Sequence, residues 1–330
     1  MPPKVVILDT NFPDNDAERR LCREAGVELT IAQCRSEDEV VAAAHDADGV
    51  IAQYAPLTAG SIAGLARCRI ISRYGIGVDN IDLAAATERG VWVANVPGFC
   101  APEVSDHALA LALAFGRRLF SLDRSVREGR WDVIGVAGQT GRLAESTLGI
   151  VGFGQIGRLL AAKASRLGLR VLATSPRSAA EHAAAHGAEA VDLARLLSES
   201  DYVVLLCPLT PQTRHLINRQ TLALMRPGAH LINVSRGALV DEPALIEALE
   251  SGRLAGAGLD VFEREPPADD SPLRRLPNVV MTPHAAYYSS RALAELQERV
   301  TLNVLEALAG RMPASTLNPE ARAGRGAGPR

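Results

Sequence analysis

Short apolar runs rich in β-branched residues alternate with longer segments rich in Ala, Leu and Glu along most of this 330-residue chain. This alternation predicts βα units, and hence parallel sheets that helices cover on both faces. A first series of expected strands comprises Val5–Leu8, Glu28–Ala32, Gly49–Gln53, Ile70–Arg73 and Trp92–Asn95. A second series comprises Leu148–Gly152, Arg170–Ala173, Tyr202–Cys207, His230–Val234, Gly256–Val261 and Val279–Thr282. Two such series predict an α/β protein with two doubly wound parallel-sheet domains.

Helical patterns separate the expected strands, as at Ala17–Ala25 and Glu242–Glu250. Residues 102–120 are apolar on all sides, which predicts one long helix buried between two domains or two subunits. We expect residues 1–100 and 289–317 to form one domain, to which the last long helix, Ser290–Ala309, returns. Residues 101–288 would then be a second domain inserted into the first. Residues 318–330 have too little apolar content to fold and are expected to be a flexible tail.

The composition narrows the class of protein. Hydrophobic residues make up 47% of the chain and charged residues 22%, as in soluble globular proteins. The net charge of −3, without a run of Lys and Arg, argues against nucleic acid and anionic membranes as partners. Five cysteines without a C-x-x-C pair fit neither a disulfide framework nor a metal site. No leader and no apolar run near the roughly 20 residues that span a bilayer are present, so the expected location is cytoplasmic.

A glycine-rich loop opens the second series. Gly152-Phe153-Gly154-Gln155-Ile156-Gly157 follows an expected strand and begins an expected helix. Gly152 permits a tight turn, Gly154 lets the backbone approach a pyrophosphate, and Gly157 allows the helix to pack closely on the strand. The helix start at Gln155 and Ile156 supplies amide donors and a partial positive charge. The loop predicts a Rossmann-like dinucleotide-binding domain; a purely structural glycine turn is the alternative.

The end of the next strand bears on which dinucleotide is bound. An acidic side chain about 20 residues after the loop would hold the ribose 2′-hydroxyl of NAD. Here the sequence has Thr174-Ser175-Pro176-Arg177-Ser178 instead. Ser175 and Arg177 can accept a 2′-phosphate, because a guanidinium forms paired charge-assisted hydrogen bonds with phosphate. We therefore predict NADP(H) rather than NAD(H), with a solvated arginine in a surface turn as the alternative.

Three further segments lie at expected strand ends, where α/β proteins usually build their sites. They are Asn233–Gly237, Leu259–Pro267 and Thr282–Ala286. Together with the loop at 73–82, they resemble the D-isomer-specific 2-hydroxyacid dehydrogenase family over nearly the whole chain.

The resemblance implies roles for three charged or titratable residues. Arg236 would pair with the substrate carboxylate, Glu265 would support the histidine, and His284 would be the acid/base. The chemistry is consistent, since reduction of a ketone builds negative charge on oxygen and histidine titrates in the working pH range. Taken singly, each residue also has a structural explanation: a surface ion pair, a loop carboxylate or a core histidine.

The same resemblance implies further contacts. Asp260 would hold the nicotinamide carboxamide, and Val234 and the loop that includes Cys207, Pro208 and Thr213 would run beside the cofactor. A structural turn is the alternative for that loop. No metal is expected.

On the substrate side, Tyr74-Gly75-Ile76-Gly77 resembles the family loop whose amides receive the substrate carboxylate, and its glycines allow close approach. Arg73 could meet a second anionic group, although a strand-end ion pair is the stronger alternative. After the histidine the chain carries Tyr287, as in the branch that includes the C-terminal-binding proteins. An aromatic there would line the pocket and favour an apolar or bulky substituent, or it would pack at the domain hinge.

These features predict a D-2-hydroxyacid dehydrogenase that acts mainly as a 2-oxoacid reductase if NADPH is the donor. Two alternatives stay open: an NAD(P)H-sensing binding protein like the C-terminal-binding proteins, and a dehydrogenase of a phosphorylated or phosphonate hydroxyacid. The intact Arg236, Glu265 and His284 favour an enzyme over a sensor. The resemblance and the apolar helix at 102–120 also imply a homodimer.

Overall fold

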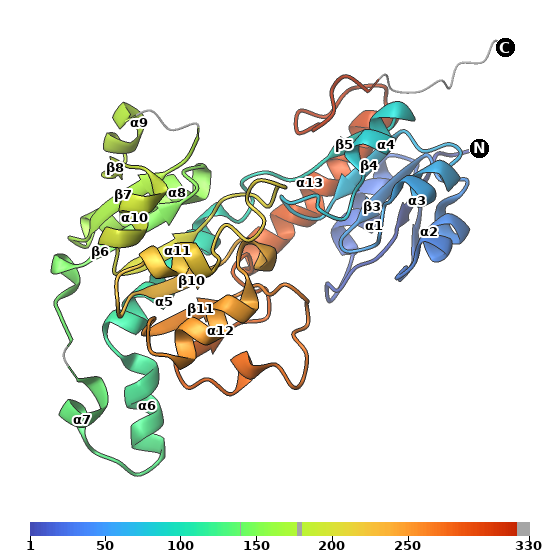
Figure 1. Cartoon of the computed structure of the whole chain (residues 1–330). Helices are drawn as coiled ribbons and strands as arrows, with labels where there is room; N and C mark the ends of the chain where they lie inside the picture. Colours follow the sequence, from blue (N-terminus) through green and yellow to red (C-terminus); the bar gives the residue numbers. More distant parts are fainter. Residues whose placement is uncertain (139, 177–179, 322–330) are drawn as a thin grey trace. The chain divides into compact units, whose positions relative to one another are not determined.

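The chain forms two compact units, which are Met1–Phe99 together with the chain from Ser289 onward, and Cys100–Tyr288. The computed structural model describes residues 1–138, 140–176 and 180–321 (Figure 1). Because the second unit begins and ends within the chain of the first, it is an insertion. Both units are built on parallel sheets, which confirms the predicted α/β class with two doubly wound, Rossmann-like domains.

The first unit contains a five-stranded parallel sheet with the order β2-β1-β3-β4-β5. Its strands are β1 (Lys4–Ile7), β2 (Glu28–Ile31), β3 (Gly49–Ala52), β4 (Ile70–Arg73) and β5 (Trp92–Ala94). Its helices are α1 (Asp16–Glu24), α2 (Glu37–Ala44), α3 (Ala59–Gly64), α4 (Leu83–Glu88) and α13 (Ser290–Leu308). Helices α2, α3 and α4 share one core with Val6 and Val50, while α13 packs against α1 and the central strands. Burial on both faces explains why these strands read as continuous apolar runs.

The second unit contains a seven-stranded parallel sheet with the order β12-β11-β10-β9-β6-β7-β8. Its strands are β6 (Thr147–Val151), β7 (Arg170–Thr174), β8 (Glu189–Ala190), β9 (Tyr202–Leu205), β10 (His230–Asn233), β11 (Gly256–Leu259) and β12 (Val279–Met281). Its helices are α5 (Ala101–Gly116), α6 (Leu119–Arg127), α7 (Val133–Ala137), α8 (Gln155–Arg166), α9 (Ala180–Ala184), α10 (Leu193–Glu199), α11 (Arg219–Leu224) and α12 (Glu242–Glu250).

The strand order of the second unit reverses at β6. The chain runs outward from β6 through β7 and β8, and then returns to β9 on the other side of β6. The residues that follow β6 and β9 therefore lie next to each other at the carboxyl edge of the sheet. In open α/β sheets this switch point is where a ligand crevice forms.

The predicted single helix at 102–120 is wrong. Helix α5 ends at Gly116, Arg118 adopts a left-handed conformation with φ 55°, and α6 starts at Leu119. A Cβ at Gly116 would lie 2.7 Å from the Tyr202 hydroxyl, so close packing on β9 requires glycine there. The apolar pattern continues through the break, so the sequence carries no local signal of it. Helices α6 and α7 extend away from the sheet of the second unit (Figure 1).

The end of the described chain also differs from the prediction. Residues 318–321, expected in a flexible tail, pack against the first unit. Asn318 is buried, accepts a hydrogen bond from the Val93 amide at 2.7 Å, and donates to the Val91 carbonyl at 2.9 Å. The Ala321 carbonyl accepts from the Trp92 indole at 2.9 Å. Within the described chain, no helix combines the length and apolar character needed to cross a bilayer.

Candidate active site

The glycine loop after β6 has the geometry of a dinucleotide cradle. Gly152 adopts φ +103°, and a Cβ there would lie 2.4 Å from the Cys207 backbone nitrogen. A Cβ at Gly157 would lie 2.5 Å from the Gly152 carbonyl, so α8 can approach the strand only without a side chain. Gly154, in contrast, has open space where a Cβ would be. It is the N-cap residue of α8, and no side chain there accepts a hydrogen bond from the first amides of the helix. The first amides of α8, including those at Gln155 and Ile156, are thus left for a ligand, and the loop fits a pyrophosphate.

The loop after β9 packs beside this cradle. The Cys207 carbonyl accepts a hydrogen bond from the Ser235 hydroxyl at 2.7 Å, which ties the loop to the segment after β10. Thr213 closes the loop, because its hydroxyl donates to the Pro208 carbonyl at 2.7 Å. Burial raises the pKa of the Cys207 thiol to about 11, so this residue stays a protonated thiol at neutral pH. Val234, at the end of β10, is buried.

Of the two residues predicted to read the ribose, Ser175 follows the end of β7 and is partly exposed. Arg177 lies outside the described residues. The end of β7 carries no carboxylate, since the strand finishes at Thr174 and continues into Ser175 and Pro176.

His284 and Glu265 form a hydrogen-bonded pair in the second unit. The His284 Nδ1 lies 2.7 Å from the Glu265 Oε2, and the two side chains are 28% and 32% exposed. The other oxygen of Glu265 accepts from the Phe262 amide at 3.1 Å. Burial would raise the pKa of Glu265, but the hydrogen bond and charge of His284, the Phe262 amide and the charge of Arg236 together lower it. The pair therefore provides an ionised carboxylate that orients an imidazole whose Nε2 edge remains for another partner.

Arg236 reaches this pair from the segment after β10. The Asn233 side chain donates to the Arg236 carbonyl at 2.8 Å and fixes the local turn. A Cβ at the next residue, Gly237, would lie 1.8 Å from the Phe262 carbonyl carbon. The glycine thus lets the Arg236 segment lie directly on the strand-end loop that carries Glu265, which explains the influence of Arg236 on the Glu265 carboxylate.

Asp260 holds the backbone of the His284 loop. Its Oδ1 accepts from the Thr282 hydroxyl at 2.5 Å and from the Ala285 amide at 2.8 Å. Its Oδ2 accepts from the Ala286 amide at 2.9 Å. Asp260 is 1% exposed, and its backbone carbonyl accepts from the His284 amide at 2.8 Å. These bonds stabilise the left-handed backbone of His284, which has φ 52°. The Tyr287 ring follows 6.4 Å from the imidazole in an edge-on arrangement.

In the first unit, the loop after β4 buries the side chain of its tyrosine. The Tyr74 side chain is buried, and its hydroxyl donates to the Glu18 carboxylate at 2.5 Å. Gly75 adopts φ +132°, and a Cβ there would meet the Arg73 guanidinium, so the arginine lies across the loop. Within the described chain, the Ile76 and Gly77 amides donate to no protein acceptor.

Comparison with known proteins identifies the family. Residues 109–286 match the family model of the D-isomer specific 2-hydroxyacid dehydrogenase NAD binding domain. This chain belongs to that family. It is 39% identical over 290 residues to a glyoxylate reductase of Korarchaeum cryptofilum, covering 86% of this chain and 87% of the relative. It is 38% identical over 296 residues to a hydroxypyruvate reductase of Thermotoga maritima, covering 89% of this chain and 94% of the relative.

Solved structures agree with this assignment. An acyclic imino acid reductase in complex with NADPH and D-Arg superposes with a TM-score of 0.85 at 26% identity, covering 95% of this chain and 99% of that one. A D-lactate dehydrogenase of Aquifex aeolicus, complexed with NAD and lactic acid, gives 0.84 at 27% identity with the same coverage. By class, this member of the 2-hydroxyacid dehydrogenase family is a nicotinamide-dependent oxidoreductase.

Two groups of paired side chains in the second unit were not predicted from the sequence. The Nε2 of His215, on the loop after β9, forms a hydrogen bond with the Glu263 carboxylate. On α8, the Arg158 Nη1 lies 3.4 Å from the His182 Nε2, and the rings of His182 and His186 lie 6.5 and 6.1 Å from the Phe153 ring of the glycine loop. No motif marks these residues, because each pairing joins distant parts of the chain.

Proposed function

We propose that this dehydrogenase interconverts a 2-oxoacid and a D-2-hydroxyacid, with His284 as the acid/base. The observation that carries the proposal is the His284–Glu265 pair, 2.7 Å apart, at the carboxyl edge of the sheet that carries the glycine loop. Glu265 accepts from Nδ1, so Nε2 is the nitrogen that exchanges a proton with the substrate oxygen.

When bound, the nicotinamide supplies the hydride for reduction or accepts it in the reverse direction. The residues of this chain do the rest. Gly152 and the first amides of α8 hold the pyrophosphate, and Cys207, Pro208 and Thr213 line the cofactor. The side chain of Asp260 positions the His284 loop through hydrogen bonds to that loop. The segment that carries Asp260 also contacts the nicotinamide carboxamide.

Arg236 is proposed to bind the substrate carboxylate and to polarise the carbonyl. A guanidinium forms two parallel hydrogen bonds with a carboxylate, which fixes orientation as well as affinity. The Ile76 and Gly77 amides are proposed to receive an anionic group of the substrate, with Gly75 allowing the loop its conformation. The Tyr74 hydroxyl already donates a hydrogen bond to Glu18, so we propose that Tyr74 binds substrate only through its backbone.

Replacing His284 tests the acid/base role. His284→Gln should lower kcat about 10²- to 10⁴-fold, the usual contribution of a general acid or base. The Kd of the reduced cofactor, measured by fluorescence, should change little. The matched control is His215→Gln, which breaks another histidine–carboxylate pair of the same unit. Equal turnover in His284→Gln and wild type would refute the role.

The substrate class is proposed to be small 2-oxoacids. Relatives named glyoxylate reductase and hydroxypyruvate reductase support small substrates, although Tyr287 beside His284 would favour an apolar substituent. A spectrophotometric screen of 2-oxoacids, including glyoxylate and hydroxypyruvate, against both reduced cofactors tests this. Cofactor binding without turnover of any 2-oxoacid would favour a sensor instead.

We propose NADP(H) as the preferred cofactor. The end of β7 lacks a carboxylate for the ribose, and the basic side chains Arg158, His182 and His186 gather beside the glycine loop. A similar reductase was solved with NADPH, while a similar lactate dehydrogenase was solved with NAD. Ser175→Asp should lower the ratio of kcat/KM for NADPH to that for NADH at least tenfold, through repulsion of the 2′-phosphate. A clear NADH preference of the wild type would overturn the proposal.

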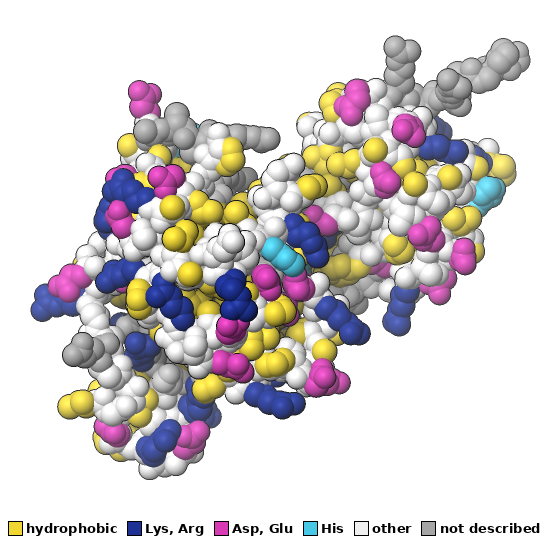
Figure 2. Space-filling model, viewed as in Figure 1, with side chains coloured by type: hydrophobic (Ala, Val, Ile, Leu, Met, Phe, Trp, Pro, Cys, Tyr) yellow, Lys and Arg dark blue, Asp and Glu magenta, His cyan; other side chains and the backbone are white. Residues whose placement is uncertain are grey.

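A homodimer through α6 and α7 is also proposed. Trp131, Val133 and Ile134 are 88%, 66% and 84% exposed, and hydrophobic side chains gather where this segment extends from the second unit (Figure 2). Exposed apolar side chains clustered in this way are typical of a protein–protein interface. A second copy of this chain is the proposed partner, since most soluble oligomers are symmetric homo-oligomers.

A further inference from the structure

The loop that follows β4 carries four successive backbone amides at the carboxyl edge of the first unit's sheet. The first two, those of Tyr74 and Gly75, already donate to backbone carbonyls at 2.9 Å. The next two, those of Ile76 and Gly77, donate to no acceptor in the described chain. The loop lies at the surface of its unit, since the Ile76 side chain is 37% exposed. The direction of the last two amides therefore decides whether this loop can bind an anion.

The two peptide groups that contain these amides are held by their carbonyls. The Gly75 carbonyl accepts a hydrogen bond from the Val96 amide at 2.9 Å. The Ile76 carbonyl accepts one from the Asn95 Nδ2 at 2.7 Å. Asn95 and Val96 follow the end of β5, the strand beside β4. One backbone donor and one side-chain donor thus tie the 75–77 loop to the neighbouring strand end.

The anchored carbonyls fix the direction of the two amides. Both peptide bonds of the 75–77 loop are trans, and in a trans peptide the carbonyl and the amide point in opposite directions within one plane. The Ile76 amide shares its plane with the Gly75 carbonyl, and the Gly77 amide shares its plane with the Ile76 carbonyl. Both amides therefore point away from the segment that holds the carbonyls. Successive amides that point outward together can bind one anionic group.

Asn95 is itself held in place. It is 7% exposed, and its carbonyl accepts from the Asn303 side chain of α13 at 3.0 Å. The same Nδ2 of Asn303 lies 3.3 Å from the Ser72 hydroxyl of β4. The Asn303 oxygen accepts from the Ser315 hydroxyl at 3.2 Å. Strand β4 and helix α13 thus fix the backbone that carries the Asn95 donor.

We propose that Asn95 is a positioning residue for substrate binding, because its side chain holds the Ile76 carbonyl and so aims the Gly77 amide at the substrate carboxylate. This inference rests on the proposed function, in which the Ile76 and Gly77 amides receive an anionic group of the substrate. Asn95 does not itself touch the substrate. Without its donor, the peptide between Ile76 and Gly77 can rotate and turn a carbonyl toward the carboxylate, which that carbonyl repels.

Two substitutions remove the donor in different ways. Asn95→Leu keeps about the same size and removes both polar atoms of the side chain. Asn95→Asp keeps the shape but replaces the donor with an oxygen that repels the Ile76 carbonyl. Leucine adds no charge, so an effect shared by both variants belongs to the lost donor. Asn95→Ala, which is also neutral, replaces Asn95→Leu if leucine prevents folding.

Asn318 provides the matched control in the same unit. It is 2% exposed, and its Nδ2 donates to the Val91 carbonyl at 2.9 Å. This hydrogen bond holds the residue before β5 rather than the 75–77 loop. Asn318→Leu and Asn318→Asp therefore remove the same kind of buried donor without changing the direction of the Gly77 amide.

The experiment measures steady-state kinetics of the full chain with saturating reduced cofactor. The substrate is glyoxylate, hydroxypyruvate or pyruvate, whichever the wild type reduces with the highest kcat/KM. Both Asn95 variants should raise KM about tenfold or more, the loss expected for one hydrogen bond to a charged group. The change in kcat should stay below about threefold, because His284 and Glu265 belong to the second unit. The Ki of oxamate, a non-reducible analogue of a 2-oxoacid, should rise in parallel with KM.

Three results would overturn the inference while the proposed function stands. The first is a wild-type KM and Ki in Asn95→Leu. The second is an increase in Asn95→Asp alone, which would assign the effect to the added charge. The third is an equal increase in the Asn95 and Asn318 variants, which would assign it to a general loss of stability, measured for all variants by thermal melting. If the wild type reduces no 2-oxoacid and binds no oxamate, the proposed function fails and the inference fails with it.

Discussion

Gly152 and Gly154 lie two residues apart in the same loop, yet they are required for different reasons. Gly152 needs its positive φ and has the Cys207 backbone where a Cβ would be, so the folded chain itself demands glycine. Gly154 has a negative φ of −79° and open space around it. Only a ligand that approaches its backbone can make glycine necessary at residue 154.

Alanine at each position separates these two requirements. Gly154→Ala should melt close to the wild-type temperature but bind NADPH at least tenfold more weakly, because a methyl group obstructs the pyrophosphate. Gly152→Ala should lower the melting temperature and lose cofactor binding as well. Alanine would be strained at the positive φ, and its methyl group would clash with the Cys207 backbone. Differential scanning fluorimetry and cofactor fluorescence measure the two quantities. Unchanged NADPH affinity in Gly154→Ala would contradict the cradle role.

Asp48 is a buried charge that stabilises the first unit. Its side chain is 2% exposed and accepts from the Lys4 amide at 2.9 Å, from Arg67 at 2.9 Å and from Arg69 at 3.3 Å. Burial would raise the pKa of Asp48, but the amide and the two arginines outweigh it and lower the pKa. A carboxyl whose pKa is lower in the folded state stabilises the fold above its unfolded pKa. That contribution is lost as the pH falls through the folded pKa.

Asp48→Asn should therefore reduce the free energy of unfolding by about 1–3 kcal/mol at pH 7. The difference from wild type should shrink below about pH 4, where Asp48 begins to be protonated in the unfolded chain. Urea unfolding measured between pH 7 and pH 3 tests this dependence. The control is Asp46→Asn, an exposed carboxylate paired with Lys4, which should leave stability nearly unchanged. A loss for Asp48→Asn that does not vary with pH would rule out the charge as its cause.

At the scale of elements, a chain of side chains links α5 to the ends of β11 and β12. Asp260 follows β11 and can only accept hydrogen bonds when ionised, so the Thr282 hydroxyl must donate to it. Thr282 must then accept from the His107 Nε2, 3.2 Å away on α5, which assigns a proton to that nitrogen. The linkage positions the loop that carries His284.

Thr282→Val keeps the shape of the side chain and removes its hydroxyl. The His284 loop should lose part of its alignment, and kcat should fall about tenfold with little change in cofactor Kd, because small displacements of a catalytic group are costly. The control is Thr301→Val on α13, whose hydroxyl donates to the Gln297 carbonyl in the first unit. If Thr282→Val lowered only the melting temperature and left kcat intact, the hydroxyl would serve the fold alone.

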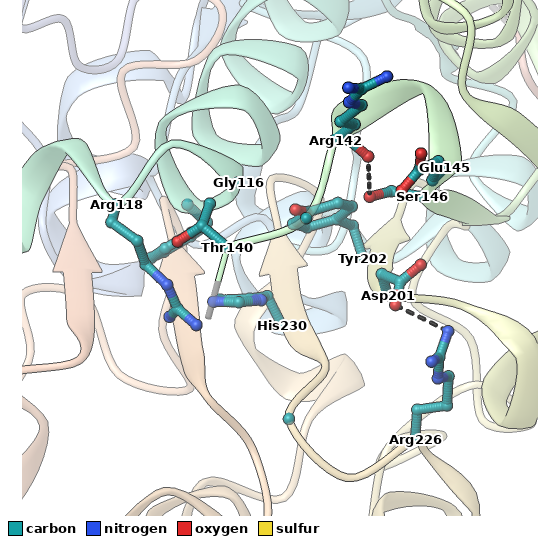
Figure 3. A pocket seen from close by; sticks show the side chains of 13 residues that line it. Gly116, Arg118, Thr140, Arg142, Glu145, Ser146, Asp201, Tyr202, Arg226 and His230 are labelled. Atoms are coloured by element: carbon teal, nitrogen blue, oxygen red, sulfur yellow. Dashed lines mark hydrogen bonds and ion pairs between the residues drawn. The ribbon is translucent and has the colours of Figure 1, made fainter. Parts of the chain in front are cut away.

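Much of the element pattern could be predicted because it depends on local sequence. Buried parallel strands such as β3 and β9 read as apolar runs, and the glycine loop identifies its own strand and helix. The break at Arg118 could not be predicted, since the apolar pattern runs through it and the neighbouring Gly116 packs close to Tyr202, a residue far along the chain. The His215–Glu263 pair likewise joins residues far apart in the chain, as does the stacking of His230 on Tyr202 (Figure 3). Glu265 and His284 were placed in one site through family resemblance, as spacing alone does not bring them together.

At the scale of the whole molecule, the exposed α6–α7 segment is the interface of the homodimer that we propose. Wild type should behave as a dimer at micromolar concentration in multi-angle light scattering. Ile134→Asp should shift the population toward monomer, because it places a charge within the apolar surface. Leu224→Asp, at an exposed leucine on α11, is the matched control and should remain dimeric. A monomeric wild type would contradict the assembly.

The insertion of one unit into the other also sets an order of events during translation. All five strands of the first unit leave the ribosome before the second unit does, but α13, which covers their sheet with Val300 and Val304, emerges last. The inserted unit is complete as soon as Tyr288 emerges. The middle of the nascent chain can thus finish folding while the amino-terminal sheet still exposes one apolar face, the reverse of the usual amino-terminal-first order. A ribosome that stalls between Tyr288 and α13 would therefore carry a complete second unit together with a first unit whose sheet still lacks its covering helix.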